Sequence, residues 1–271
     1  MADVTIFGAS GFIGAQLAAH FERIGRRVRC VTRNNWPETG ADLGDCIFAI
    51  GMTASFRRFP LQTVETQVVR LHEVLTRYRF SSLLYLSSTR VYRDAAGTSE
   101  ENALLLRPHL ADDIYNATKL AGEALCLALG QPGIRVARLS NVYGPTDRSE
   151  LFLTDVLRTA ITTGQVVLRS APSSAKDYLF VDDAVAQLAA IAGRGEQRLY
   201  NVAAGVNVTN AGIAALLRAE SVDVSFAPGA ADISFPRIDT RRARGEFGLI
   251  PQGLAMVLPG VFRTLQLELA R

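Results

Sequence analysis

The stretch TIFGASGFIGAQL, residues 5–17, decides the fold of this chain of 271 residues. It joins an apolar, β-branched run to a stretch with helical periodicity. Gly8 permits a tight turn, Gly11 lets the backbone approach a pyrophosphate, and Gly14 lets the helix pack against the strand. Free N–H groups and the positive dipole end at the helix start attract phosphates. The junction predicts a dinucleotide-binding turn, and a glycine-rich turn without a ligand is the alternative. The residues expected beside the ligand are Gly8, Ser10, Gly11, Phe12, Ile13 and Gly14.

Short apolar runs alternate with longer amphipathic stretches up to residue 145, and the rhythm changes after Pro145. Strands that read as continuous apolar runs between helices indicate a parallel sheet covered on both faces. The pattern therefore predicts an α/β fold, a Rossmann-type doubly wound parallel sheet followed by a small C-terminal α+β lobe. We expect residues 1–145, with about 177–205, to form the dinucleotide-binding domain. Residues 146–176 and 206–271 are expected to form the substrate-binding lobe.

Composition excludes several classes of function. The net charge is only +3 and the basic residues are scattered, which argues against nucleic acid as a partner. The three cysteines are far apart in apolar runs and the three histidines lack metal spacing, so we expect buried thiols, a reducing compartment and no metal site. The start lacks the features of a signal peptide, and no apolar run reaches about 18 residues, so neither export nor a membrane span is expected. A cytoplasmic protein is the expectation.

The end of the second strand, CVTRNN, bears on the choice of dinucleotide. A carboxylate at this place binds the ribose 2′-hydroxyl of NAD, whereas a basic residue accommodates the 2′-phosphate of NADP. The chain has Thr32 and Arg33 there and no carboxylate. This favours NADP, with NAD as the alternative, and Arg33 as a solvated surface arginine is the competing interpretation.

Tyr115 and Lys119 stand one helical turn apart in IYNATKLAG, so their side chains share a face. A free phenol titrates near pH ~10, and a neighbouring ammonium lowers that pKa. Tyr115 is then a candidate acid/base for a hydroxyl or carbonyl while hydride moves to or from a nicotinamide. The strand end YLSSTRVY offers Ser87, Ser88 and Thr89 as donors to the same oxygen. The alternative is an ordinary half-buried tyrosine beside a solvated lysine.

Six stretches carry a resemblance to a known family: GASGFIG, YLSSTRVY, YNATKLAGE, PGIRVARLSNVYGP, KDYLFVDDAV and YNVAAG. In this order they resemble the extended short-chain dehydrogenases/reductases of the NAD(P)-dependent epimerase/dehydratase family, which includes UDP-galactose 4-epimerase. The resemblance covers residues 3 to about 205. It implies that Tyr115 is the acid/base, that Lys119 binds the nicotinamide ribose, and that Ser88 is the catalytic hydroxyl. It also implies homodimers built from the long helix at residues 60–78 and the Tyr115 helix.

Departures from the family pattern bear on the substrate. The family usually fits a third strand and a helix where this chain has only WPETGADLGD, and Asp42 and Leu43 are candidates to replace its adenine-binding pair. The resemblance places Asn141 at a substrate or nicotinamide contact, and an Asn that organises the turn before Gly144 is the alternative. Family members usually carry a diphosphate-binding arginine at the place of Lys176 and a second arginine before the place of Arg237, so Lys176 and Arg237 either bind a smaller anion or are surface charges. Ser88 is followed by Thr89 and Arg90 rather than by an Asp–Glu pair, which disfavours dehydration.

Two functions follow from these patterns. The first is an NAD(P)-dependent oxidoreductase or epimerase acting on a secondary alcohol or ketone of a small, sugar-like molecule. The second is a non-catalytic NADP(H) sensor or regulatory protein on the same fold. The shortened segment favours the second, and the set Ser88, Tyr115 and Lys119 favours the first.

Overall fold

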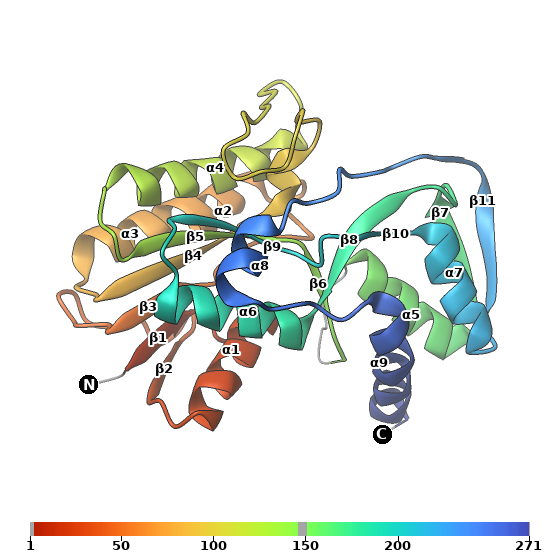
Figure 1. The fold of residues 1–271 in the computed structure, drawn as a ribbon, viewed down its shortest axis with the longest axis horizontal. Coiled ribbons are helices and arrows are strands. Elements are labelled where there is room, and N and C mark those ends of the chain that lie inside the picture. Colours follow the sequence, from red (N-terminus) through yellow and green to blue (C-terminus); the bar gives the residue numbers. More distant parts are fainter. Residues whose placement is uncertain (1–2, 146–150, 271) are drawn as a thin grey trace.

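Parallel strands in the order β2-β1-β3-β4-β5-β9 form the larger part of the computed structural model, which describes residues 3–145 and 151–270 (Figure 1). Every neighbouring pair in this sheet runs parallel. The predicted Rossmann-type doubly wound sheet is therefore confirmed. The strands are β1 (Val4–Phe7), β2 (Val28–Val31), β3 (Asp45–Phe48), β4 (Ser82–Ser88), β5 (Ile134–Leu139) and β9 (Leu199–Val202).

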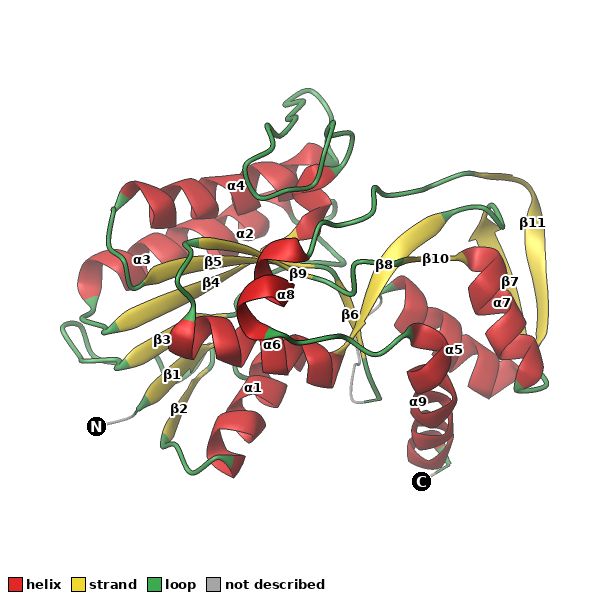
Figure 2. Ribbon diagram, viewed as in Figure 1, coloured by secondary structure: helices red, strands yellow, loops and turns green. Residues whose placement is uncertain are grey.

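Helices cover both faces of this sheet, which explains why its strands are apolar throughout (Figure 2). Ile6 points to one face, where it packs with Leu17 and Leu188, while its neighbour Phe7 packs with Phe48 on the other. The first face carries α1 (Phe12–Arg23), α6 (Val181–Arg194) and α8 (Arg241–Phe247). The second carries α2 (Pro60–Val64), the π-helical turn η1 (Glu65–Val69), α3 (Arg70–Arg77) and α4 (Asp113–Ala128).

The long helix expected at residues 60–78 is interrupted by the π-helical turn η1. Gln67 lies fully buried in this turn, where its amide donates to Met52 O at 3.1 Å and its carbonyl accepts from the Thr118 hydroxyl at 3.2 Å. The wider turn lets a polar side chain reach two partners in the interior. The sequence pattern could not reveal this, because the partners come from elsewhere in the chain.

The segment between β2 and β3 is short, and β2 forms an edge of the sheet. Leu43 is fully buried, and the Asp42 carboxylate accepts a hydrogen bond from the backbone of Gly44 at 3.0 Å. Trp36 packs on Phe7 with their ring centroids 5.1 Å apart. Leu43 therefore packs in the hydrophobic core and is not exposed to an adenine, whereas the adenine-binding role of Asp42 stays a prediction.

The smaller part of the molecule lies beside the larger one in Figure 1. Its apolar cluster includes Leu157, Ile213 and Phe262. The expected helices form, but the Pro/Gly-rich tail also contains a strand that pairs in parallel with β7 and shifts its register between Phe226 and Ala231. Its elements are β6 (Asn141–Tyr143), α5 (Phe152–Thr163), β7 (Gln165–Ser170), β8 (Ala175–Phe180), β10 (Asn207–Thr209), α7 (Asn210–Ala219), β11 (Asp223–Ala231) and α9 (Leu254–Leu269).

Sheet pairing links the C-terminal half of the chain to both parts. Strand β9 pairs with β5 in the large sheet, while β8 lies between β10 and β6 in a separate sheet. The domain boundaries at residues 145, 177 and 205 stay a prediction.

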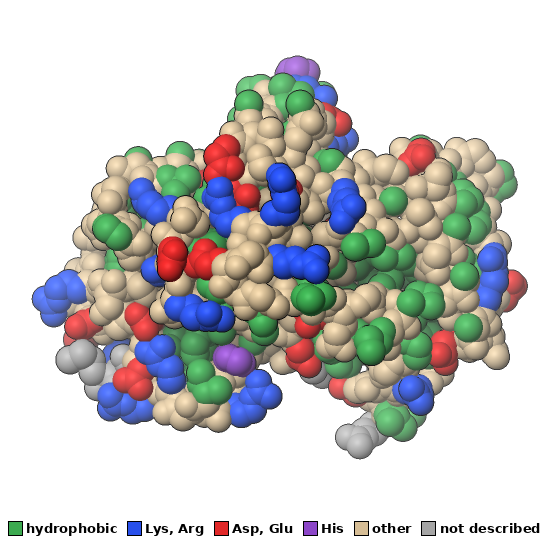
Figure 3. Space-filling model, viewed as in Figure 1, with side chains coloured by type: hydrophobic (Ala, Val, Ile, Leu, Met, Phe, Trp, Pro, Cys, Tyr) green, Lys and Arg blue, Asp and Glu red, His purple; other side chains and the backbone are tan. Residues whose placement is uncertain are grey.

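Acidic and basic side chains alternate over the larger part in Figure 3, and charges are sparser on the smaller part. Among the described residues, no helix is long and apolar enough to span a membrane, and no cluster of side chains is suited to a metal ion. Cys46 and Cys126 are buried free thiols as expected, but Cys30 is exposed. It lies on the edge strand β2, and none of the strands in the described ranges covers the outer flank of β2.

Candidate active site

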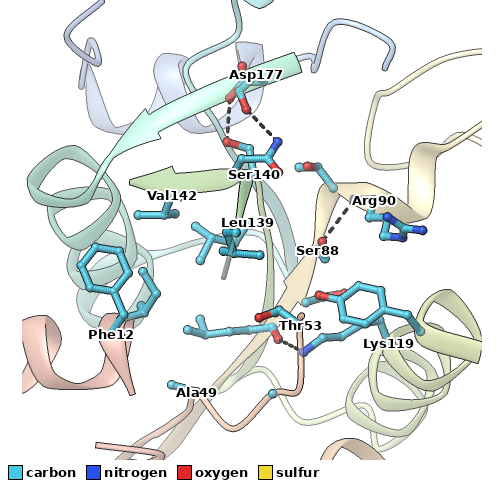
Figure 4. Close-up of a pocket in the computed structure, with 18 of the residues that line it drawn as sticks. Phe12, Ala49, Thr53, Ser88, Arg90, Lys119, Leu139, Ser140, Val142 and Asp177 are labelled. Atoms are coloured by element: carbon cyan, nitrogen blue, oxygen red, sulfur yellow. Dashed lines mark hydrogen bonds between the residues drawn. The ribbon is translucent and has the colours of Figure 1, made fainter. Parts of the chain in front are cut away.

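A cavity of about 410 Å³ lies at the carboxyl ends of β3, β4 and β5, where open α/β sheets bind ligands. Figure 4 shows Phe12 and Ala49 on one side of it, Ser88, Arg90 and Lys119 on the other, and Ser140 and Asp177 at one end. Phe235, Pro236 and Ile238, from the segment that follows β11, also line it. The predicted site residues on its wall are Gly11, Phe12, Ile13, Gly14, Ser88, Tyr115, Lys119, Asn141 and Lys176.

The glycine turn before α1 has the geometry that its sequence predicts. Gly8 has a φ of +84°, a left-handed conformation that side chains disfavour. A Cβ on Gly14 would lie 2.2 Å from the Gly8 carbonyl oxygen, so only glycine allows this approach of helix to strand. Helix α1 begins after Gly11 with no side-chain cap and no acid in its first turn. Its positive end therefore faces the cavity free to receive phosphates, which fits the pyrophosphate of a dinucleotide.

Tyr115 lies in the first turn of α4 and is only 5% exposed. Burial raises the pKa of its phenol, whereas a hydrogen bond with Ser88 and the positive charge of Arg90 act in the opposite direction. The expectation that a neighbouring ammonium lowers this pKa was wrong. Burial outweighs the charges, and the cation that acts on the phenol is Arg90 rather than Lys119.

Lys119 is 4% exposed and donates from Nζ to the carbonyl oxygen of Leu86 at 2.9 Å. Its Nζ lies 6.0 Å from the centroid of the Tyr115 ring. Burial lowers the pKa of Lys119 to about 8, although the nearby Glu123 carboxylate raises it. The ammonium is thus held near the end of β4 by a backbone oxygen, and β3 lies between β4 and the strand β1 that leads into the predicted phosphate turn.

A buried polar network lies behind Lys119. Arg138 donates to the Glu123 carboxylate at 2.6 Å, and the Ser87 hydroxyl donates to the same carboxylate at 2.5 Å. Arg138 also donates to the Tyr92 hydroxyl at 2.7 Å. Every charged group here has a partner, as burial requires, so the network anchors α4 to β4 and β5 and fixes the helix that carries Tyr115.

Several predicted residues lie off the cavity wall, namely Gly8, Ser10, Thr32, Arg33 and Arg237. Thr32 donates from its hydroxyl to the Asn35 side chain at 2.9 Å, and the neighbouring Arg33 is exposed. Arg237 donates from Nε to the carbonyl oxygen of Gly205 at 2.5 Å. The structure therefore places Arg237 in a contact that orders the chain beside the cavity, not among the groups that face it.

Asn141 and Lys176 do face the cavity. Asn141 also donates from Nδ2 to the backbone oxygen of Asp177 at 2.8 Å, which ties β6 to β8. Lys176 lies over the rings of Phe152 and Phe235, 5.1 and 5.7 Å from their centroids. Both burial and the charge of Arg90 lower the pKa of Lys176. The chain has only two lysines, Lys119 and Lys176, and both line this cavity.

Sequence reasoning missed several residues of the site, and three of them bear on its chemistry. Arg90 follows Ser88 by two residues and lines the cavity, and the sequence signal was its basic side chain beside a strand end. Phe56 comes from an irregular segment without a motif, and its ring lies 5.2 Å from that of Tyr115. Asp177 accepts from Ser140 at 2.6 Å and from the backbone N–H of Gly205 at 2.7 Å, so it joins the two parts of the molecule.

Comparison with known proteins gives a family match. The model of the NAD dependent epimerase/dehydratase family matches residues 49–203. The chain is 29% identical over 151 residues to a dTDP-glucose 4,6-dehydratase of Streptomyces griseus. This match covers 54% of the chain and only 45% of that relative, so it spans less than half of the relative's length.

Solved structures resemble the whole fold. MoeE5 in complex with UDP-glucose and NAD matches with a TM-score of 0.81 and 22% identity over 98% of this chain and 99% of that one. TunA, an NAD dependent NDP-hexosamine 5,6-dehydratase, matches with a TM-score of 0.81 and 19% identity over 100% and 99%. RMD from Pseudomonas aeruginosa complexed with NADPH matches with a TM-score of 0.80 and 20% identity over 99% and 100%. At these identities the likeness establishes the fold.

Proposed function

Because the chain belongs to the NAD dependent epimerase/dehydratase family, a family of enzymes, we propose that it catalyses hydride transfer at a carbon bearing a hydroxyl or keto group. The observation that carries this proposal is the placement of Tyr115, Ser88 and Lys119 on one wall of a cavity that also receives the uncapped start of α1. A sugar-like secondary alcohol or ketone is the proposed substrate, and epimerisation or reduction is the proposed outcome.

Tyr115, Ser88 and Lys119 each have a separate proposed role, which follows from their positions in the cavity. A bound dinucleotide would supply the hydride acceptor or donor. Tyr115 gives a proton to the carbonyl oxygen during reduction and takes it back from the hydroxyl during oxidation. Ser88, on the same cavity wall as Tyr115, donates to the same oxygen and polarises it. Lys119, fixed by Leu86 O, orients the ribose hydroxyl groups.

The protonation state of Tyr115 favours one direction at neutral pH. Burial raises the pKa of this phenol, so the proton stays on its oxygen. A protonated phenol is ready to act as the acid toward a carbonyl. A protonated phenol therefore supports the reduction direction, while oxidation requires positive charge near the phenol to stabilise the phenolate.

For the cofactor we propose a nicotinamide dinucleotide with a preference for NADP. Arg33, exposed directly after β2, supports the preference, and no carboxylate stands beside it in CVTRNN. The solved relatives include complexes with NAD and one with NADPH. We further propose a cytoplasmic homodimer that binds a small molecule. The free thiols support the compartment, and the exposed apolar residues Leu61 of α2 and Val69 of η1 support the dimer.

The test is turnover by Tyr115→Phe. Wild type and variant are mixed with NADPH and a panel of keto sugars and nucleotide-linked keto sugars, and cofactor oxidation is followed by absorbance. We expect a loss of at least ~10²-fold in rate with dinucleotide binding retained. Tyr78→Phe is the matched control, because the Tyr78 hydroxyl donates to Pro37 O away from the cavity. Full turnover by Tyr115→Phe would reject the proposal. Dinucleotide binding without turnover of any compound by the wild type would favour the NADP(H) sensor.

A further inference from the structure

A second cavity of about 260 Å³ adjoins the first and shares Arg90, Lys176 and Phe56 with it. Three cations line it, because Arg57 joins Arg90 and Lys176. No carboxylate side chain is present among its lining residues, all of which belong to the described part of the chain. A cationic chamber thus lies directly beside the wall that carries Tyr115.

The charge of Arg90 is poorly balanced. Its Nη2 lies 3.6 Å from the Asp112 carboxylate, beyond hydrogen-bonding distance. Asp112 is already bound by Arg57 through two hydrogen bonds of 2.5 and 2.8 Å, and by Arg93 at 3.4 Å. One carboxylate therefore serves three guanidinium groups. Arg90 Nε is buried and has no hydrogen-bond partner among the described residues.

Lys176 is unbalanced in the same way. Among the described residues it makes neither a hydrogen bond nor an ion pair with a carboxylate, and its ammonium lies over the aromatic rings of Phe152 and Phe235. The charge of Arg90 acts on it and lowers its pKa. Two half-buried cations that repel each other are costly unless an anion lies between them.

The contacts of Arg90 define where such an anion would bind. Its guanidinium carbon is 5.9 Å from the centroid of the Tyr115 ring and 5.3 Å from that of Phe56. Its backbone N–H donates to Ser88 Oγ at 3.2 Å. The Arg90 guanidinium therefore lies next to Tyr115 and Ser88, the two side chains proposed to contact the reacting oxygen.

We propose that the substrate carries a carboxylate or phosphate beside its reacting carbon, bound by Arg90 and Lys176. This inference rests on the proposed function and names its substrate class. A planar guanidinium matches either oxyanion through paired hydrogen bonds, and the freely rotating ammonium supplies a second contact. A neutral sugar would leave Arg90 with only its 3.6 Å contact to the shared Asp112 carboxylate, and Lys176 with no carboxylate partner among the described residues.

The test measures binding of three probes to the NADPH-loaded protein by calorimetry: D-glucuronate, D-glucose 6-phosphate and D-glucose. The two acids should bind at least tenfold more tightly than glucose. Arg90→Gln should weaken the acids roughly ten- to a hundredfold, the range of a hydrogen bond to a charged group, and leave glucose unchanged. The acid that binds more tightly identifies the oxyanion.

Arg93→Gln is the matched control, because Arg93 pairs with the same Asp112 but does not line either cavity. It should bind the acids like the wild type, and Arg90→Lys should restore part of the affinity. NADPH binding by each variant verifies its fold. The chain has only two lysines, so NMR of carbon-13 labelled lysine also reports on the contact of Lys176 with the ligand. The Lys176 signal should shift when glucuronate is added and not when glucose is added. Equal binding of acid and glucose, or equal losses in Arg90→Gln and Arg93→Gln, would overturn the proposal.

The same variants separate this inference from the proposed function. Tyr115→Phe should bind the acids normally while losing hydride transfer. Arg90-dependent acid binding without turnover would reject the proposed function alone. Turnover of neutral ketones with no preference for acids would reject the substrate class alone.

Discussion

The guanidinium of Arg90 lies 5.9 Å from the centre of the Tyr115 ring, while the backbone of Arg90 is hydrogen-bonded to Ser88. The last residue of β4 and the 3₁₀ turn η2 (Thr89–Tyr92) that follows it therefore bring the Ser88 hydroxyl and the Arg90 cation to the phenol of α4. Lys119, one helical turn from Tyr115, instead has its Nζ bound to Leu86 O. The positive charge that acts on the Tyr115 phenol therefore comes from Arg90 of η2, and not from the helix α4 that carries Tyr115.

This relationship predicts a pH effect. In alcohol oxidation Tyr115 must be a phenolate, and the positive charge of Arg90 lowers its pKa. Arg90→Gln removes that charge, so the pKa rises and the pH at which oxidation reaches its plateau moves upward. The profile of kcat against pH at saturating substrate measures the shift, and Arg93→Gln should show none. A profile unchanged by Arg90→Gln would contradict the electrostatic role.

The buried ammonium of Lys119 predicts a stability effect with a defined sign. Its pKa falls from 10.5 to about 8 on folding, so between these values the unfolded chain binds more protons and stability rises with pH. Below pH 8 the shift costs about 3 kcal/mol, offset by about 1 kcal/mol from the hydrogen bond to Leu86 O. Lys119→Met should therefore gain roughly 2 kcal/mol at pH 7 and lose this gain near pH 10.5.

Urea unfolding of Lys119→Met and wild type at both pH values checks this prediction. Lys176→Met is the comparison, since that side chain is less buried. With only two lysines, carbon-13 labelled lysine gives the pKa of Lys119 independently by NMR, and Lys176→Arg assigns the two signals. A gain that persists at pH 10.5 would show that charge burial is not its cause.

Replacement of glycine by alanine should have opposite effects on stability at Gly14, in the phosphate turn, and at Gly260, in α9. A Cβ on Gly14 would meet the Gly8 carbonyl oxygen at 2.2 Å, so Gly14→Ala forces the helix from the strand. We expect a loss of about 2 kcal/mol or more and weaker dinucleotide binding. Gly260 lies within α9 with no atom near an added Cβ, and Gly260→Ala should gain roughly 0.5–1 kcal/mol. Thermal unfolding and NADPH titration of both variants test this prediction. Equal stability of the two variants would contradict it.

The proposed cofactor preference predicts a selective loss. Fluorescence titration should show NADPH binding more tightly than NADH, and Arg33→Ala should weaken NADPH roughly tenfold while leaving NADH unchanged. Arg27→Ala is the matched control, because Arg27 is exposed beside the opposite end of β2 and paired with Asp3. Equal affinities of the wild type for the two dinucleotides would reject the preference.

The fold could be predicted from local patterns in the sequence. Apolar runs buried on both faces, and glycines at fixed spacing between a strand and a helix, have few alternative structures. The π-helical turn at Gln67 and the parallel strand β11 were not foreseen. Their formation depends on partners distant in the chain, Met52 and Thr118 for the turn and β7 for the strand.

By itself the sequence determined the doubly wound core, the phosphate turn and the presence of Tyr115, Lys119 and Ser88, because each rests on spacing along the chain. Only the tertiary structure decided the charges around them. It buried Tyr115 and Lys119, bound Arg237 to Gly205 O, and brought Arg90 and Lys176 to one chamber. Electrostatic energies depend on distance and solvent exposure, and neither is written in the order of the residues.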